Sequence, residues 1–181
     1  MANLCVLGAL DTERGHEIAA QMLQWLEPLY SVHVVWHGPD TFEYEPLQFA
    51  KALSRKYQHA PVLYLHTRGA VNTHKTTEPT HRMWRDQFGE HGSLYFHVAE
   101  NRHPLVVCPF TGSKGITWYN GFVANGAAWS KITIPPPTDR MKYERLFEST
   151  GIPVLGLLTC TDDGEAEDSI LPARKYLMKH Y

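Results

Sequence analysis

Short apolar runs and amphipathic segments alternate along the first third of the chain. The apolar runs cover residues 4–7, 32–36 and 62–65, and residues 14–28 and 45–58 carry apolar side chains at every third or fourth position. A period near 3.6 indicates a helix with one face toward a core, and a short continuous apolar run is typical of a strand buried on both faces. The pattern therefore predicts three parallel, adjacent strands joined by two right-handed helical crossovers.

The rest of the chain is less regular. We expect a polar loop at 69–78 and a surface loop at 110–119, helices at 79–88, 93–101, 139–149 and 172–180, and strands at 105–108, 122–124 and 154–158. Three prolines at 135–137 indicate a rigid extended connector. Together the elements predict an α/β fold, a three-layer α/β/α sandwich with a Rossmann-like, mostly parallel sheet, formed as one domain by residues 1–181.

Composition narrows the class of protein. The 181 residues are 43% apolar and 20% charged with a formal net charge of −2, which is ordinary globular composition without a sequence-wide attraction to nucleic acid. No apolar stretch approaches the roughly 18 residues of a membrane span, and Met1-Ala2-Asn3 does not begin a signal peptide, so we expect a cytoplasmic protein. Cys5, Cys108 and Cys160 each lie in or beside an apolar run and are predicted to be buried thiols.

Three strand ends carry glycine together with polar or charged side chains, at residues 8–11, 37–40 and 66–69. In an open parallel sheet, ligands bind outside the carboxyl ends of the strands, near the point where strand order reverses. Turn formation alone also favours these residue types. The position nevertheless predicts a binding crevice, with Arg68 as the side chain best suited to phosphate because its guanidinium can bind two oxygens at once.

Several motifs occur in a particular order. Residues 62–69 read Val-Leu-Tyr-Leu-His-Thr-Arg-Gly, Trp84-Arg85-Asp86 follows a polar loop, residues 120–125 read Asn-Gly-Phe-Val-Ala-Asn, and Arg140 precedes Tyr143-Glu144. This order resembles a family of bacterial and viral glycosyltransferase-like proteins. In that family the strand ends in Leu-Tyr-Leu-His-Thr-Lys-Gly, so Arg68 replaces the usual lysine. The aromatic doublet of the family's Gly-Asn-Phe-Trp-Trp-Ala run is weakened here, and the resemblance covers residues 4–147.

The resemblance implies a GT-A-like nucleotide-sugar transferase that passes a sugar to the hydroxyl of a glycan acceptor, as in polysaccharide biosynthesis. It also implies Mg²⁺ or Mn²⁺ in an active enzyme. However, the chain is short for such a transferase and has no evident Asp-X-Asp after a middle strand. Asp162-Asp163 is predicted to be a solvated turn. Two alternatives therefore stay open: a catalytically inactive nucleotide- or sugar-binding module of the same fold, and a flavodoxin-like interaction domain suggested by fold class alone.

Candidate roles follow from the residue types. Asp86 and Asp11 are the candidate general bases, because a carboxylate can take a proton from an acceptor hydroxyl. The candidate substrate-binding residues are His66, Thr67, Arg68, Gly69, Trp84, Arg85, Asn120 and Asn125. Trp84 could stack on a base or sugar, or pack in the core. The spacing of the eleven histidines matches no zinc pattern, so no metal site is predicted. Asp11-Thr12-Glu13 is predicted to cap the helix that follows it.

Overall fold

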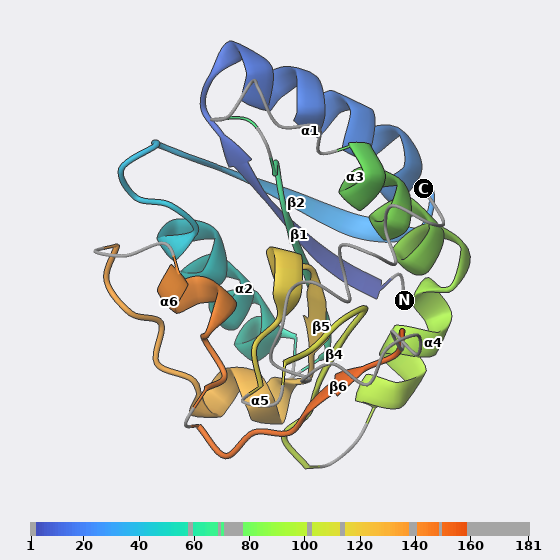
Figure 1. Cartoon of the computed structure of the whole chain (residues 1–181), viewed down its shortest axis with the longest axis vertical. Helices are drawn as coiled ribbons and strands as arrows, with labels where there is room; N and C mark the ends of the chain where they lie inside the picture. Colours follow the sequence, from blue (N-terminus) through green and yellow to red (C-terminus); the bar gives the residue numbers. More distant parts are fainter. Residues whose placement is uncertain are drawn as a thin grey trace.

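The computed structural model describes residues 3–57, 60–68, 70, 78–100, 103–112, 115–137, 141–148 and 150–158. Six strands form one sheet in the order β2-β1-β3-β5-β4-β6 (Figure 1). The strands are β1 (Asn3–Leu10), β2 (Tyr30–His37), β3 (Val62–His66), β4 (Val106–Cys108), β5 (Phe122–Ala124) and β6 (Val154–Gly156).

The first three strands are adjacent and parallel, as the apolar runs predict. β1 pairs along its whole length with β2 and, from Leu4 to Gly8, with β3. β5 runs antiparallel to both β3 and β4, while β4 and β6 are parallel to each other. The sheet is therefore mixed but mostly parallel.

Helices cover both faces of the sheet. They are α1 (Glu13–Leu26), α2 (Tyr44–Lys56), α3 (Glu78–Trp84), the π-helical turn η1 (Arg85–Glu90), α4 (Gly92–Ala99), the short η2 (Trp118–Asn120), α5 (Gly126–Lys131) and α6 (Met141–Glu144). One core cluster joins the sheet to α1, α3, η1 and α4, and a second joins it to α2, α5 and α6. Figure 1 shows these two groups on opposite sides of the strands.

Some elements differ from the sequence prediction. The helix expected at 79–88 changes from α3 into the π turn η1, and the helix expected at 139–149 is reduced to α6. Helix α5 was not predicted, because its six residues are too short to show a period. The expected helix at 172–180, Cys160 and the Asp162-Asp163 turn lie outside the described residues.

The turn from β1 into α1 is tightly packed. Thr12 caps α1 as predicted, its hydroxyl oxygen accepting from the Gly15 N–H at 3.1 Å. A Cβ at Gly15 would overlap the main-chain oxygen of Leu10, so only glycine lets α1 approach the end of β1 this closely. Cys5 and Cys108 are fully buried, as predicted, and burial raises the pKa of both thiols.

The order of the strands reverses at β1. The chain passes from β1 through α1 to β2 on one side, and from β2 through α2 to β3 on the other side of β1. The carboxyl ends of β1 and β3 therefore flank the switch point, where a ligand is expected in a sheet of this kind. Among the helices of the described ranges, none is long and apolar enough to cross a membrane.

Candidate functional site

A buried polar cluster lies at the carboxyl end of β3. His66, the last residue of β3, has its Nδ1 3.4 Å from Oε1 of Glu43, which directly precedes α2. Its Nε2 lies 3.2 Å from the main-chain oxygen of Tyr119. Both side chains of the pair are only 7% exposed. Because both ring nitrogens face oxygen acceptors, only the doubly protonated ring can donate to both of them.

Asn120 completes this arrangement. Its Nδ2 donates to Oε2 of Glu43 at 3.0 Å, and its Oδ1 accepts from the Thr117 hydroxyl at 3.4 Å. The two oxygens of the Glu43 carboxylate thus face two different partners from distant parts of the chain. We refer to Glu43, His66, Tyr119 and Asn120 as the switch-point cluster.

The main chain around the cluster is strained. Phe42, Tyr119 and Asn120 have φ of 48°, 66° and 56°, and they are the only non-glycine residues with positive φ in the described ranges. Phe42 precedes Glu43, and the other two belong to the cluster. Such backbone costs about 1–3 kcal/mol a residue and concentrates at functional sites. The surrounding structure therefore holds this cluster in place against a cost.

Arg68 and Thr67 follow His66 at the end of β3, beside the cluster. The Arg68 guanidinium lies 4.6 Å from the centroid of the Tyr119 ring, and the residue is half-buried. Thr67 joins the two strand ends, because its Oγ1 accepts from the Leu10 N–H at 3.0 Å and its own N–H donates to Gly8. Gly69, also predicted here, lies outside the described residues.

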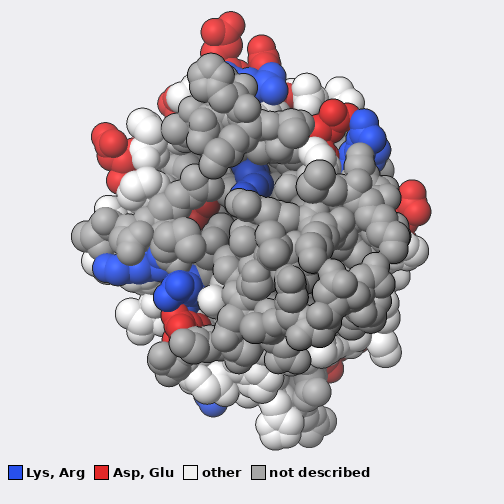
Figure 2. Space-filling view, in the orientation of Figure 1, with Lys and Arg blue, Asp and Glu red and all other residues white. Residues whose placement is uncertain are grey.

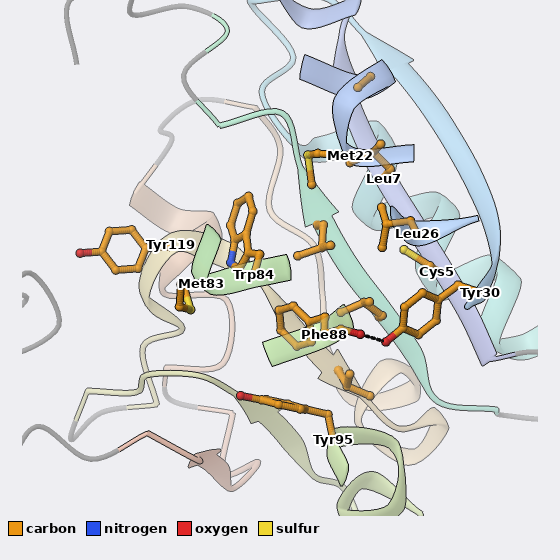
Figure 3. Close-up of a cluster of buried hydrophobic side chains, with 14 of the residues drawn as sticks. Cys5, Leu7, Met22, Leu26, Tyr30, Met83, Trp84, Phe88, Tyr95 and Tyr119 are labelled. Carbon is orange, nitrogen blue, oxygen red and sulfur yellow. Dashed lines mark hydrogen bonds between the residues drawn. The ribbon is translucent and has the colours of Figure 1, made fainter. Parts of the chain in front are cut away.

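Trp84 packs in the core beside the cluster. It is fully buried, its ring centroid is 5.6 Å from that of His66 in an edge-on arrangement, and among the described residues its indole Nε1 has no hydrogen-bond partner. Figure 3 shows Trp84 within the apolar cluster, with the hydroxyl of Tyr119 directed away from it. Of the two roles considered for Trp84, the structure assigns packing.

The other predicted residues lie in varied surroundings. Arg85 is exposed on η1, and within the described ranges no hydrogen bond or ion pair links it to the cluster, so its share in the site stays a prediction. Asp86 on η1 is half-buried. Asp11 follows β1, is exposed, and its carboxylate lies 2.9 Å from His16 Nε2.

Asn125 has a structural role. Its Oδ1 accepts from the N–H groups of Ala128, at 2.9 Å, and Leu105, at 3.2 Å, while its Nδ2 donates to the His103 main chain at 2.7 Å. It thereby caps α5 and fastens the chain before β4. In the 120–125 motif that suggested substrate binding, Asn125 is therefore a capping residue of α5.

Tyr64 and Tyr143 lie close enough to Glu43 for its charge to act on them. Burial, and then the negative charge of Glu43, raise the pKa of Tyr64 well above its usual value. Burial and Glu43 also raise the pKa of Tyr143 to about 12. Both phenols therefore stay neutral near pH 7.

Glu43 is the residue that sequence reasoning missed. The second strand end predicted to carry ligand-binding residues covers residues 37–40, and Glu43 lies three positions beyond it. A signal was present, since a carboxylate directly before a helix and just after a strand end lies where ligands bind in such sheets.

His81 on α3 predicts a pH dependence of stability. Its Nε2 donates to the Arg68 main-chain oxygen at 3.1 Å, and burial lowers its pKa from 6.5, with the Arg68 and Arg14 charges lowering it further. As the pH is lowered below about 6.5, the unfolded chain takes up a proton at His81 that the folded chain does not. The free energy of unfolding therefore decreases as the pH is lowered. Urea unfolding measured as the pH is lowered through this region should show a smaller loss of unfolding free energy for His81→Gln than for the unmodified protein. Replacing the exposed His97 by glutamine should leave the loss unchanged, and an equal loss in His81→Gln would contradict this account.

The charged side chains of the described residues do not gather by sign in the view of Figure 2. In Figure 2 the described acidic and basic side chains lie mostly around the rim, with both signs interspersed. In the part of the chain that the structure describes, no three His, Cys, Asp or Glu side chains gather as a metal site. Comparisons with protein-family models, with curated proteins and with solved structures find no match to this chain.

Proposed function

We propose that the protein binds a nucleotide-activated sugar at the carboxyl ends of β1 and β3 and transfers the sugar to an acceptor hydroxyl, as a GT-A-like Rossmann protein. The observation that carries the proposal is the switch-point cluster. A buried, hydrogen-bonded Glu43–His66–Asn120 group, held by strained backbone, stands at the place in the sheet where ligands bind. The proposed class of ligand rests on the resemblance of the ordered sequence motifs to the glycosyltransferase-like family.

In the proposed site, one residue contacts the ligand and others hold it in position. Arg68, half-buried over the Tyr119 ring, is the proposed contact to the diphosphate, because its fork matches two phosphate oxygens. His66 and Glu43 hold the Tyr119–Asn120 segment, whose Tyr119 ring lies against Arg68, and so act as positioning residues. Asp11 is the better placed general-base candidate, because it follows β1, whose Gly8 pairs with His66.

One observation favours the second candidate, a binding module without transfer. The polar atoms of His66 and Glu43 already face protein partners, and the Asp11 carboxylate is paired with His16. A general base needs an oxygen directed at the acceptor hydroxyl. In this alternative the same site binds the nucleotide and releases it unchanged.

Calorimetry with a panel of nucleoside diphosphates and nucleotide sugars, together with an assay for released nucleoside diphosphate, tests both candidates. Binding with release supports the transferase, and binding without release supports the binding module. If no member of the panel binds at millimolar concentration, both are wrong.

Replacing Arg68 by alanine is expected to weaken binding of the nucleoside diphosphate about 10- to 150-fold, because a charged hydrogen bond to phosphate contributes roughly 1.5–3 kcal/mol. The free energy of unfolding of the ligand-free protein should fall by no more than about 1 kcal/mol, the loss of one cation–π contact. Arg55→Ala, at an exposed position of α2, is the matched control and should bind as the unmodified protein does. Unchanged affinity in Arg68→Ala would place the phosphate site elsewhere.

A further inference from the structure

Strand β2 forms an edge of the sheet, and it has none of the features that usually stop an edge strand from pairing with another chain. Its eight residues pair with β1 in unbroken register from Tyr30 to His37, and no strand of the described ranges pairs with its outer side. The strand contains no charged residue and no proline. Its outer side therefore offers a row of N–H and C=O groups to another strand.

The opposite edge of the sheet is different. Strand β6 has three residues, Val154–Gly156, and shortness is one of the ways in which proteins blunt a sheet edge. Edges are otherwise blunted by lysines, prolines or bulges, and β2 has none of these. Of the two edges, β2 is the one suited to extend the sheet.

Exposed apolar side chains flank this edge. Trp36 on β2 is 40% exposed, Leu29 just before the strand is 46% exposed, and Phe49 on α2, whose ring lies 5.7 Å from that of His33 on β2, is 38% exposed. Three of the six large exposed apolar side chains in the described ranges thus gather around a single strand. Clustered apolar exposure of this kind marks an interaction surface.

We propose that β2 pairs antiparallel with β2 of a second copy of this chain, so that one sheet runs through a two-fold dimer. A register centred on Val34 places Trp36 opposite Val32 and His33 opposite Val35. Aromatic and β-branched residues pair favourably across antiparallel strands, and an uncharged strand meets its own copy without repulsion. An isologous two-fold contact is also the commonest form of self-association.

The available area suits a stable dimer. Eight residues of strand span about 27 Å, and a sheet covered by a helix on each face is about 25 Å thick. The edge therefore presents about 700 Å² for each partner, or about 1,400 Å² in total, which lies within the range of stable specific interfaces.

Sedimentation equilibrium of the full chain tests the proposal, which predicts a dimer at micromolar concentration. In this register Trp36→Lys and Ser31→Lys place a lysine, the residue that blunts natural sheet edges, opposite Val32 and His37 of the second copy, and should raise the dissociation constant about 100-fold or more. Ser31 is exposed, so this second variant keeps the test valid if loss of Trp36 perturbs the fold. The matched control is Leu155→Lys on β6, where the exposed fraction of the leucine is 43%. It should remain a dimer.

A second measurement tests the register. Val34→Cys should form an interchain disulfide on mild oxidation, because residues directly opposite in antiparallel strands are about 4.5–5.5 Å apart between Cα atoms, within disulfide reach. Leu155→Cys should not. A monomeric unmodified protein, as expected if another segment of the chain or a different protein covers β2, would overturn the proposal. So would a dimer that survives both lysine variants on β2.

Discussion

Glu43→Ala is expected to lower the free energy of unfolding by about 2–6 kcal/mol, because two buried polar side chains lose their shared partner at about 1–3 kcal/mol each. The substitution leaves the His66 ring and the Asn120 amide without the carboxylate they face, in a place where both are nearly inaccessible to water. It also removes the group that holds Tyr119 and Asn120 at positive φ. Urea unfolding followed by circular dichroism measures the loss.

Two further variants serve as controls for Glu43→Ala. Glu43→Gln keeps the shape and one acceptor and should cost less, about 1–3 kcal/mol. Glu45→Ala, two residues further at an exposed position of the first turn of α2, should cost under about 1 kcal/mol. If Glu43→Ala is no worse than Glu45→Ala, the cluster does not hold the strained backbone, and its proposed positioning role is wrong.

Trp84→Ala should cost a similar amount, about 3–5 kcal/mol, because it empties the space of a fully buried indole. The contact between Trp84 and Gly121 allows a sharper test. A Cβ at Gly121 would overlap the indole Nε1 and lie 2.9 Å from Cε2, so Gly121→Ala should cost about 1–3 kcal/mol by overpacking.

Trp84→Phe removes the part of the ring that such a Cβ would meet. Gly121→Ala should therefore cost less in the Trp84→Phe background, with a coupling free energy of about 0.5–3 kcal/mol in the double-mutant cycle. Gly38→Ala, where no atom lies within 4 Å of the added Cβ, is the control and should change stability by under about 0.5 kcal/mol. Additive effects at 84 and 121 would show that the indole does not require glycine at 121.

The first half of the sheet could be predicted from the sequence, because its signals are local. The apolar runs that became β1, β2 and β3 are continuous, and the helices between them have a clear period. Thr12 could be assigned as a cap for the same reason, since its partner Gly15 is three residues away. The antiparallel direction of β5 could not be predicted, because three residues carry no mark of strand direction.

The sequence predicted where the candidate site lies in the sheet, but it did not predict all of the residues that form the switch-point cluster. Strand-end position pointed to His66 and Arg68, which the structure joins through Tyr119. Glu43 was missed because its role depends on Asn120, 77 residues away, and no periodicity reports such a contact. Trp84 and Asn125 carry the residue types of a binding motif, yet one fills the core and the other caps a helix. Residue type alone does not separate these roles.

A crystal structure of the protein grown with a nucleoside diphosphate tests the central claim most directly. We predict density for the diphosphate at the carboxyl ends of β1 and β3, with its oxygens within hydrogen-bond distance of the Arg68 guanidinium and the switch-point cluster unchanged beneath it. A diphosphate bound at another part of the molecule, with Arg68 still resting on the Tyr119 ring and touching no ligand, would contradict the account.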